Sequence, residues 1–170
     1  MRQPDFTKLK RAEKTEIITK AVLRTLLIEG KGRRVGLPEI NVNVSKGTPT
    51  LRIDVLEINR NSDYLIGYEV KSCISDFRAD KKWGGYVKLV NKLYFVFDKV
   101  TYDKYKVEIL KTLAGKAGIY IYSSTADWIY LETEPKPQIT KHNKNIFRIM
   151  LFNYLLRTQI KESNTNGGQK

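Results

Sequence analysis

The sequence predicts one α/β domain with a mixed β-sheet flanked by helices. Its 170 residues, 41% of them hydrophobic, are enough to bury a single core. Two early strands separated only by a polar loop predict an antiparallel hairpin. Helices then separate the later strands, which indicates an α/β sandwich and argues against a helical bundle or a barrel. We expect the domain to span residues 1–162, followed by a disordered tail over 163–170.

The first part of the chain predicts one helix and three strands. Residues 12–30 carry apolar side chains at helical spacing, and a glycine-rich link ends the helix. Residues 36–45 alternate between apolar side chains and asparagine, as a half-exposed strand does. The second and third strands, 49–58 and 63–72, surround the turn-rich loop NRNSD.

Helices and strands alternate in the remainder of the chain. The expected order is helix, strand, helix, strand, strand and terminal helix, over residues 74–90, 91–97, 101–116, 117–124, 127–136 and 145–160. Ser75 or Asp76 is expected to cap the first of these helices, and Trp83 to pack on the sheet. The sheet should therefore hold about six strands. The apolar terminal helix either packs on this sheet or forms a homodimer interface.

The net charge of +13 is spread along nearly the whole chain. This favours a polyanionic partner, of which nucleic acid is the commonest. An anionic membrane surface or an acidic protein is also negatively charged and is the alternative. No phosphate-binding loop or dinucleotide fingerprint is present, so nucleotide-driven chemistry is not expected. The one histidine, His142, has no ligand partners in sequence and is assigned no role.

Cysteine content and hydropathy indicate the compartment. Cys73 is the only cysteine, which excludes an internal disulfide framework. No apolar segment approaches the roughly 20 residues that span a bilayer, and the N-terminus lacks the apolar core of a secretory signal. We therefore expect a cytoplasmic, reducing environment and no membrane partner.

Charged residues interrupt two of the predicted strands. Glu69 and Lys71 share one face of the third strand, because side chains alternate between faces. The hairpin should bring Asp54 alongside Glu69, and the apolar neighbours of Asp54 should both lie on the opposite face of its strand. Two carboxylates on a rigid sheet suit Mg²⁺, and a lysine beside the ion can orient an attacking water.

The three residues Asp54, Glu69 and Lys71 resemble the D…E-x-K motif of the PD-(D/E)xK nuclease superfamily, although Ile53 stands where the superfamily name has proline. The following string SDFRADKKWGGY, with VNKLYFVF after it, resembles the MmcB-like DNA-repair family over roughly residues 50–122. This resemblance implies a restriction-endonuclease-like core, a Mg²⁺ cofactor for which Mn²⁺ can substitute, and cleavage of DNA. It also implies that Asp54, Glu69 and the Val70 carbonyl hold the metal, while Lys71 positions the water.

Further site residues are expected in the helix over 74–90. Lys82 and Tyr86 are spaced i, i+4 and should share a face, which resembles the Q-x-x-x-Y pair of RecB-like nucleases. Lys82 could then hold a substrate phosphate, with a solvated lysine as the alternative. Arg78 and Lys81 are the other DNA-binding candidates of this helix.

Acidic side chains offer support to this site. Asp76 and Asp80 are candidates for it, with helix capping as the alternative for Asp76. Superfamily members often place an acidic residue on the first helix, which makes Glu16 a candidate metal ligand. A solvated glutamate is the alternative, and Glu39 is a second candidate.

The sequence thus predicts a Mg²⁺-dependent DNA endonuclease. It should be structure-selective or nonspecific, because no separate recognition domain is visible, and it should act in repair, recombination or phage DNA processing. The alternative from another class is a non-catalytic DNA-binding module that retains the nuclease fold. A third interpretation is a structural domain in which Glu69 and Lys71 form only an ion bridge.

Overall fold

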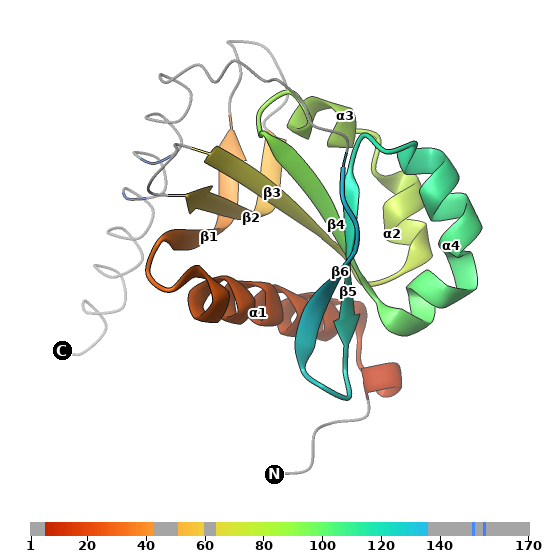
Figure 1. Cartoon of the computed structure of the whole chain (residues 1–170). Coiled ribbons are helices and arrows are strands. Elements are labelled where there is room, and N and C mark those ends of the chain that lie inside the picture. Colours follow the sequence, from red (N-terminus) through yellow and green to blue (C-terminus); the bar gives the residue numbers. More distant parts are fainter. Residues whose placement is uncertain (1–5, 43–50, 60–63, 136–150, 152–154, 156–170) are drawn as a thin grey trace, which may run out of the picture.

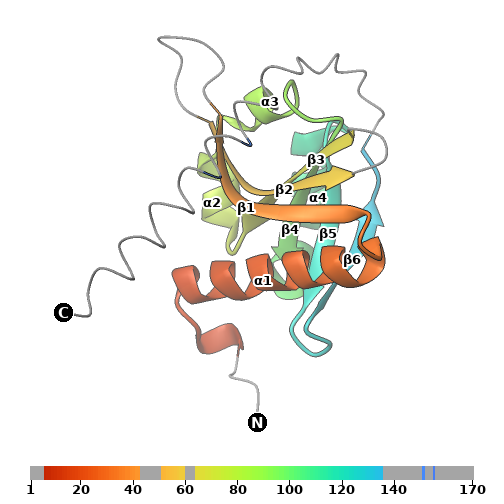
Figure 2. The same ribbon diagram turned by 90° about the vertical axis from the view of Figure 1, so that its left-hand side faces the viewer.

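The computed structural model describes residues 6–42, 51–59, 64–135, 151 and 155. Within them, one mixed β-sheet lies between helix α1 on one side and helices α2 and α4 on the other (Figures 1 and 2). The helical elements are η1 Phe6–Lys8, α1 Arg11–Gly30, α2 Ile74–Ala79, α3 Trp83–Tyr86 and α4 Lys99–Leu113. The strands are β1 Arg34–Val42, β2 Leu51–Asn59, β3 Tyr64–Lys71, β4 Lys92–Asp98, β5 Gly118–Ser123 and β6 Trp128–Thr133.

The six strands lie in sequence order, from β1 to β6. Strands β1, β2 and β3 pair antiparallel, β3, β4 and β5 pair parallel, and β6 returns antiparallel to β5. The prediction of an α/β domain with about six strands is confirmed, and the arrangement is consistent with a restriction-endonuclease-like core.

A hydrophobic cluster covers each face of the sheet. On one face, Ile18, Val22 and Leu26 of α1 pack against side chains from β2 to β6. On the other, Phe77 of α2 makes edge contacts with Phe95 and Phe97 of β4. Trp83 packs edge-on against Phe95, as expected, with ring centroids 6.0 Å apart. These two cores fix α1 and α2 on opposite sides of the strand that carries Glu69.

The prediction of one continuous helix over residues 74–90 is wrong. It divides into α2 and α3, separated by Asp80, Lys81 and Lys82. Asp80 leaves the helical conformation, with φ −76° and ψ 97°, and its Oδ1 accepts the backbone N–H of Lys82 at 3.0 Å. Two adjacent glycines in α3 also weaken a continuous helix. The cap prediction was wrong too, because Cys73 occupies the N-cap position of α2.

Strand β2 departs from regular alternation at Asp54. Ile53 belongs to the core beneath α2 and α4, whereas Val55 belongs to the core beneath α1, so the two do not share a face as predicted. Pairing with β1 is regular at Pro38↔Val55 and Ile40↔Ile53, and the residue between them, Glu39, has a positive φ of 51°. The irregularity therefore lies at Asp54, opposite Glu39 of β1.

Several predicted segments lie outside the described residues. They include the end of the strand over 36–45, nearly all of the terminal helix over 145–160, and the tail over 163–170. The homodimer interface considered for the terminal helix lies there as well. Among the described helices, none is long and apolar enough to cross a membrane.

Candidate active site

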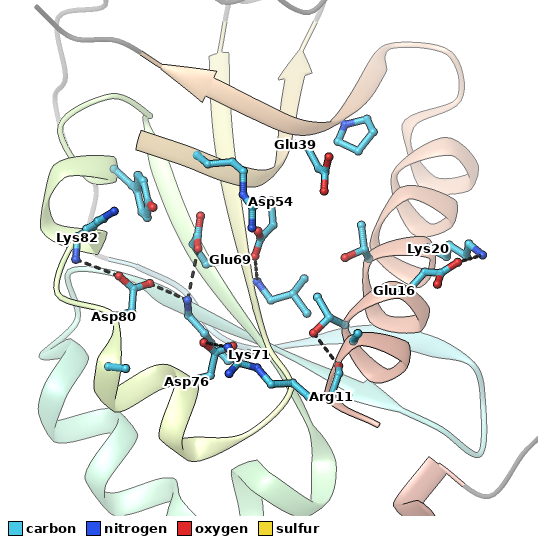
Figure 3. A pocket seen from close by; sticks show the side chains of 18 of the residues that line it. Arg11, Glu16, Lys20, Glu39, Asp54, Glu69, Lys71, Asp76, Asp80 and Lys82 are labelled. Carbon is cyan, nitrogen blue, oxygen red and sulfur yellow. Dashed lines mark hydrogen bonds and ion pairs between the residues drawn. The ribbon is translucent and has the colours of Figure 1, made fainter. Parts of the chain in front are cut away.

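A cleft of about 1070 Å³ lies between α1 and the α2–α3 segment, with strands β1, β2 and β3 as its floor (Figure 3). Asp54, Glu69 and Lys71 all line it, together with Val70. The last residue pair of the antiparallel ladder between β2 and β3 is Val55↔Tyr68. Asp54 and Glu69 are the residues directly beyond this pair, one on each strand. The predicted triad is therefore brought together in one cavity.

Glu69 is the most deeply buried carboxylate of the cleft, with 3% of its surface exposed. Its Oε2 lies 3.5 Å from the Lys71 ammonium, while its Oε1 is buried and accepts no hydrogen bond from the described residues. Burial, and then the neighbouring charge of Asp54, raise the pKa of Glu69 well above its ordinary value. A buried, half-satisfied carboxylate is unstable unless a cation or a proton neutralises it.

Asp54 bridges the end of the ladder between the two strands. Its Oδ2 accepts the backbone N–H of Val70 at 2.9 Å, in the position where a strand carbonyl would otherwise accept. Burial raises the pKa of Asp54, although the bond from Val70 and the charge of Lys71 oppose that shift. The hydrogen bond from Val70 thus fixes the orientation of the Asp54 carboxylate.

Lys71 is surrounded by carboxylates. Its ammonium donates to Asp80 Oδ2 at 2.6 Å and lies farther from Glu69. Burial alone would favour the neutral amine, but Glu69, Asp80 and Asp54 together raise the pKa of Lys71 above its ordinary value. The group is therefore an ammonium at neutral pH, suited to donate hydrogen bonds to a water or a phosphate oxygen.

The other DNA-binding candidates have different positions. Lys81, Lys82 and Tyr86 line the cleft, so Lys82 and Tyr86 lie on a common side, as predicted, although Lys82 is the N-cap of α3 and not a residue inside a helix. Tyr86 is buried, and burial raises the pKa of its phenol, which stays protonated. Arg78 does not line the cleft, since its guanidinium donates two hydrogen bonds of 2.7 Å to Glu108 of α4.

The acidic candidates on α1 and α2 are engaged elsewhere. Glu16 lines the cleft, but its side chain is 65% exposed and pairs with Lys20, whose hydrogen bond lowers the pKa of Glu16. Its expected position near the buried face is therefore wrong. Asp76 pairs with Arg11 of α1. Within the described part of the chain, no three acidic, cysteine or histidine side chains converge closely enough to hold a metal by themselves.

Sequence reasoning missed the contacts that join α1 to the start of α2. Arg11 pairs with Asp76 across the cleft mouth, and Thr15 Oγ1 lies 3.1 Å from Ser72 Oγ. These residues are 65 and 57 positions apart in sequence, and no local pattern signals such pairings. Arg52, which lines the cleft from β2, was also missed.

The donor set fits a magnesium ion that keeps most of its own water. Mg²⁺ is commonly bound through one or two carboxylates, with waters and substrate phosphates in the other positions. Asp54 and Glu69 provide two carboxylates, and Glu69 Oε1 is a buried oxygen without a hydrogen-bond partner among the described residues. A third acidic ligand from Glu16 is not needed for this geometry.

By its fold and its site, the chain is an α/β protein in which two carboxylates and a lysine lie together in a cleft at a mixed β-sheet. The sequence profile described as DNA repair protein MmcB-like matches residues 2–124, and the chain belongs to this family. Membership associates the chain with DNA repair and hence with DNA as a partner. The SPO1766 protein of unknown function from Silicibacter pomeroyi has a similar fold, with 19% identity, a TM-score of 0.64, and coverage of 96% of this chain and 97% of that one. No curated protein matches.

Proposed function

We propose that this MmcB-like protein is a Mg²⁺-dependent endonuclease that hydrolyses DNA phosphodiester bonds, with Mn²⁺ as a substitute metal. One observation carries the proposal: a buried glutamate with an unpartnered oxygen, Glu69, lies in a cleft beside Asp54 and a lysine ammonium. The D…E-x-K order of these residues supports membership of the PD-(D/E)xK superfamily. Asp54 and Glu69 would hold the metal with the Val70 carbonyl, and Lys71 would position the water.

In the proposed reaction, the oxygen of a water forms a bond to phosphorus while the bond from phosphorus to one bridging oxygen breaks. The water gives up a proton to the surrounding solvent, and the leaving oxygen takes up a proton to become a hydroxyl group. Lys71 donates to the attacking water or to a non-bridging phosphate oxygen, since its ammonium is held at the cleft floor. The Val70 N–H fixes the orientation of the Asp54 carboxylate, so Asp54 needs little reorganisation to bind a metal. When bound, Mg²⁺ would lower the pKa of the water and offset charge that builds on the phosphate.

The cleft rim formed by β2 and α3 is suited to the DNA backbone. Arg52, Lys81 and Lys82 are exposed there, and none of them forms an ion pair within the described residues. On the opposite wall, Arg11 and Lys20 are already paired with carboxylates. The negatively charged DNA backbone binds most strongly to cations that no carboxylate has neutralised. We therefore place the bound DNA strand along the β2–α3 rim of the cleft.

Replacing Lys82 by alanine is expected to weaken DNA binding and to make it less salt-dependent. A lysine that neutralises one phosphate contributes about one unit to the slope of log affinity against log salt. Titrations with labelled DNA in EDTA, at several salt concentrations, measure this slope. Lys111→Ala, an exposed lysine of α4 away from the cleft, is the matched control and should keep the wild-type slope. An unchanged slope for Lys82→Ala would remove Lys82 from the interface.

Cleavage of labelled duplex, single-stranded, flap and four-way-junction DNA tests the proposed activity. The wild-type protein is incubated with Mg²⁺, Mn²⁺ or EDTA, and metal-dependent products are expected on at least one substrate. The preferred substrate then distinguishes structure-selective from nonspecific cutting. Salt-sensitive binding without turnover on any substrate would instead support a non-catalytic DNA-binding module.

A further inference from the structure

Asp80 lies in the break between α2 and α3, where both of its carboxylate oxygens are engaged. Oδ2 accepts the Lys71 ammonium at 2.6 Å, and Oδ1 accepts the Lys82 backbone N–H at 3.0 Å. Only 11% of its side chain is exposed. The backbone bond anchors the carboxylate to the start of α3, so Asp80 cannot follow Lys71 freely if the lysine moves.

Lys71 has two carboxylates within reach and is closer to one of them. Its ammonium lies 2.6 Å from Asp80 and 3.5 Å from Glu69 (Figure 3). It also lies 5.6 Å from the centre of the Phe95 ring. A charged hydrogen bond is normally about 2.7–2.9 Å long, so the Glu69 contact is loose. Glu69 consequently keeps one oxygen without any partner among the described residues.

We propose that Asp80 is a positioning residue that holds Lys71 away from Glu69 and thereby keeps the Glu69 carboxylate available to a divalent cation. This inference rests on the metal site of the proposed function. Without Asp80, the ammonium would close on Glu69, because a buried ammonium needs a counter-charge and Glu69 is the nearest other one. The lysine would then compete with the metal for the same oxygens.

The test is metal affinity, measured calorimetrically with Mg²⁺ and Mn²⁺ and without DNA. Asp80→Asn removes the anion and keeps an acceptor for the Lys82 N–H, and it should weaken binding about tenfold, the lower end of the range for residues that orient metal ligands. Asp80→Ser, which also retains a capping oxygen, should give the same loss. Asp103→Asn, which breaks an exposed pair with Lys99 on α4, is the control and should bind like the wild type.

The decisive variant combines Asp80→Asn with Lys71→Met. Because the competing ammonium is gone, metal affinity should return to the wild-type value or exceed it. A purely structural role for Asp80 predicts the opposite, namely that the double variant binds as weakly as Asp80→Asn or more weakly. Equal affinity of Asp80→Asn and wild type would overturn the positioning role while leaving the metal site intact. A wild-type protein that binds neither metal would overturn both proposals.

Discussion

Replacing Glu69 by glutamine is expected to reduce Mg²⁺-dependent DNA cleavage about a thousandfold, a loss of about 4 kcal/mol of transition-state stabilisation. Glutamine has the size of glutamate but lacks its charge, so the pair of carboxylates that would hold the metal is lost. Calorimetry should show metal binding weakened in parallel. Cleavage at the wild-type rate would contradict the proposed site.

The same substitution is expected to stabilise the metal-free protein at neutral pH. The pKa of Glu69 is raised in the folded state, so the folded protein binds its proton more tightly than the unfolded chain does. The stability that this proton provides is present below the ordinary pKa of 4.5 and is lost as the pH rises through the folded value. In EDTA, the unfolding temperature of Glu69→Gln minus that of the wild type should therefore increase as the pH rises from 5 to 8.

Glu57 provides a matched control for this variant. It is another buried carboxylate, 1% exposed, and burial raises its pKa too, but it lies outside the cleft and accepts a hydrogen bond from Tyr68. Glu57→Gln should keep metal binding and cleavage within about twofold of the wild type, because Glu57 is not among the residues that line the cleft. A loss equal to that of Glu69→Gln would indicate a general effect of removing buried charge.

The parts of the site that sequence could predict are those set by local pairing. A short hairpin loop and strict alternation along β3 suffice to place Asp54 near Glu69 and to put Glu69 and Lys71 on one face. The irregular alternation around Asp54 depends on how β1 and β2 meet at Glu39, which no pattern within β2 reveals. The catalytic and metal-binding roles of these residues stay predictions.

The helix break at Asp80 could not be predicted from periodicity. The sequence from residue 74 to 90 has helical spacing, but the contact of Asp80 with Lys71 depends on the packing of α2 against the sheet. Glu16 shows the converse error, because its neighbours Ile17 and Ile18 suggested a buried side chain and Lys20 holds it in solvent. Tertiary packing decided the first outcome, and no window of sequence shows it. The Glu16–Lys20 pair is instead a local i, i+4 contact, which competes with burial of the glutamate.

Replacing Lys71 by methionine is expected to have the opposite effect on stability from Glu69→Gln, although both variants should lose cleavage. Methionine fills the space of the lysine stem but leaves Asp80 and Glu69 without their shared cation, and removing one partner of a buried ion pair costs about 3 kcal/mol. Urea unfolding in EDTA at pH 8 measures this loss. It should shrink as the pH falls toward 5, because Glu69 and Asp54, whose pKa values are raised, then take up protons.

Adding Mn²⁺ should stabilise Lys71→Met more than it stabilises the wild type, because the metal then replaces the missing ammonium between the carboxylates. Lys106→Met, which breaks a partly exposed ion pair between α4 and Glu132 of β6, should change stability by less than about 1 kcal/mol and show no such metal effect. If Lys71→Met were neutral or stabilising in EDTA, the lysine would be a dispensable ion bridge, as the structural interpretation holds. Equal losses of cleavage with opposite changes in stability would instead support Glu69 as a metal ligand. They would support Lys71 both as the cation that positions the water and as the counter-charge that keeps the empty site folded.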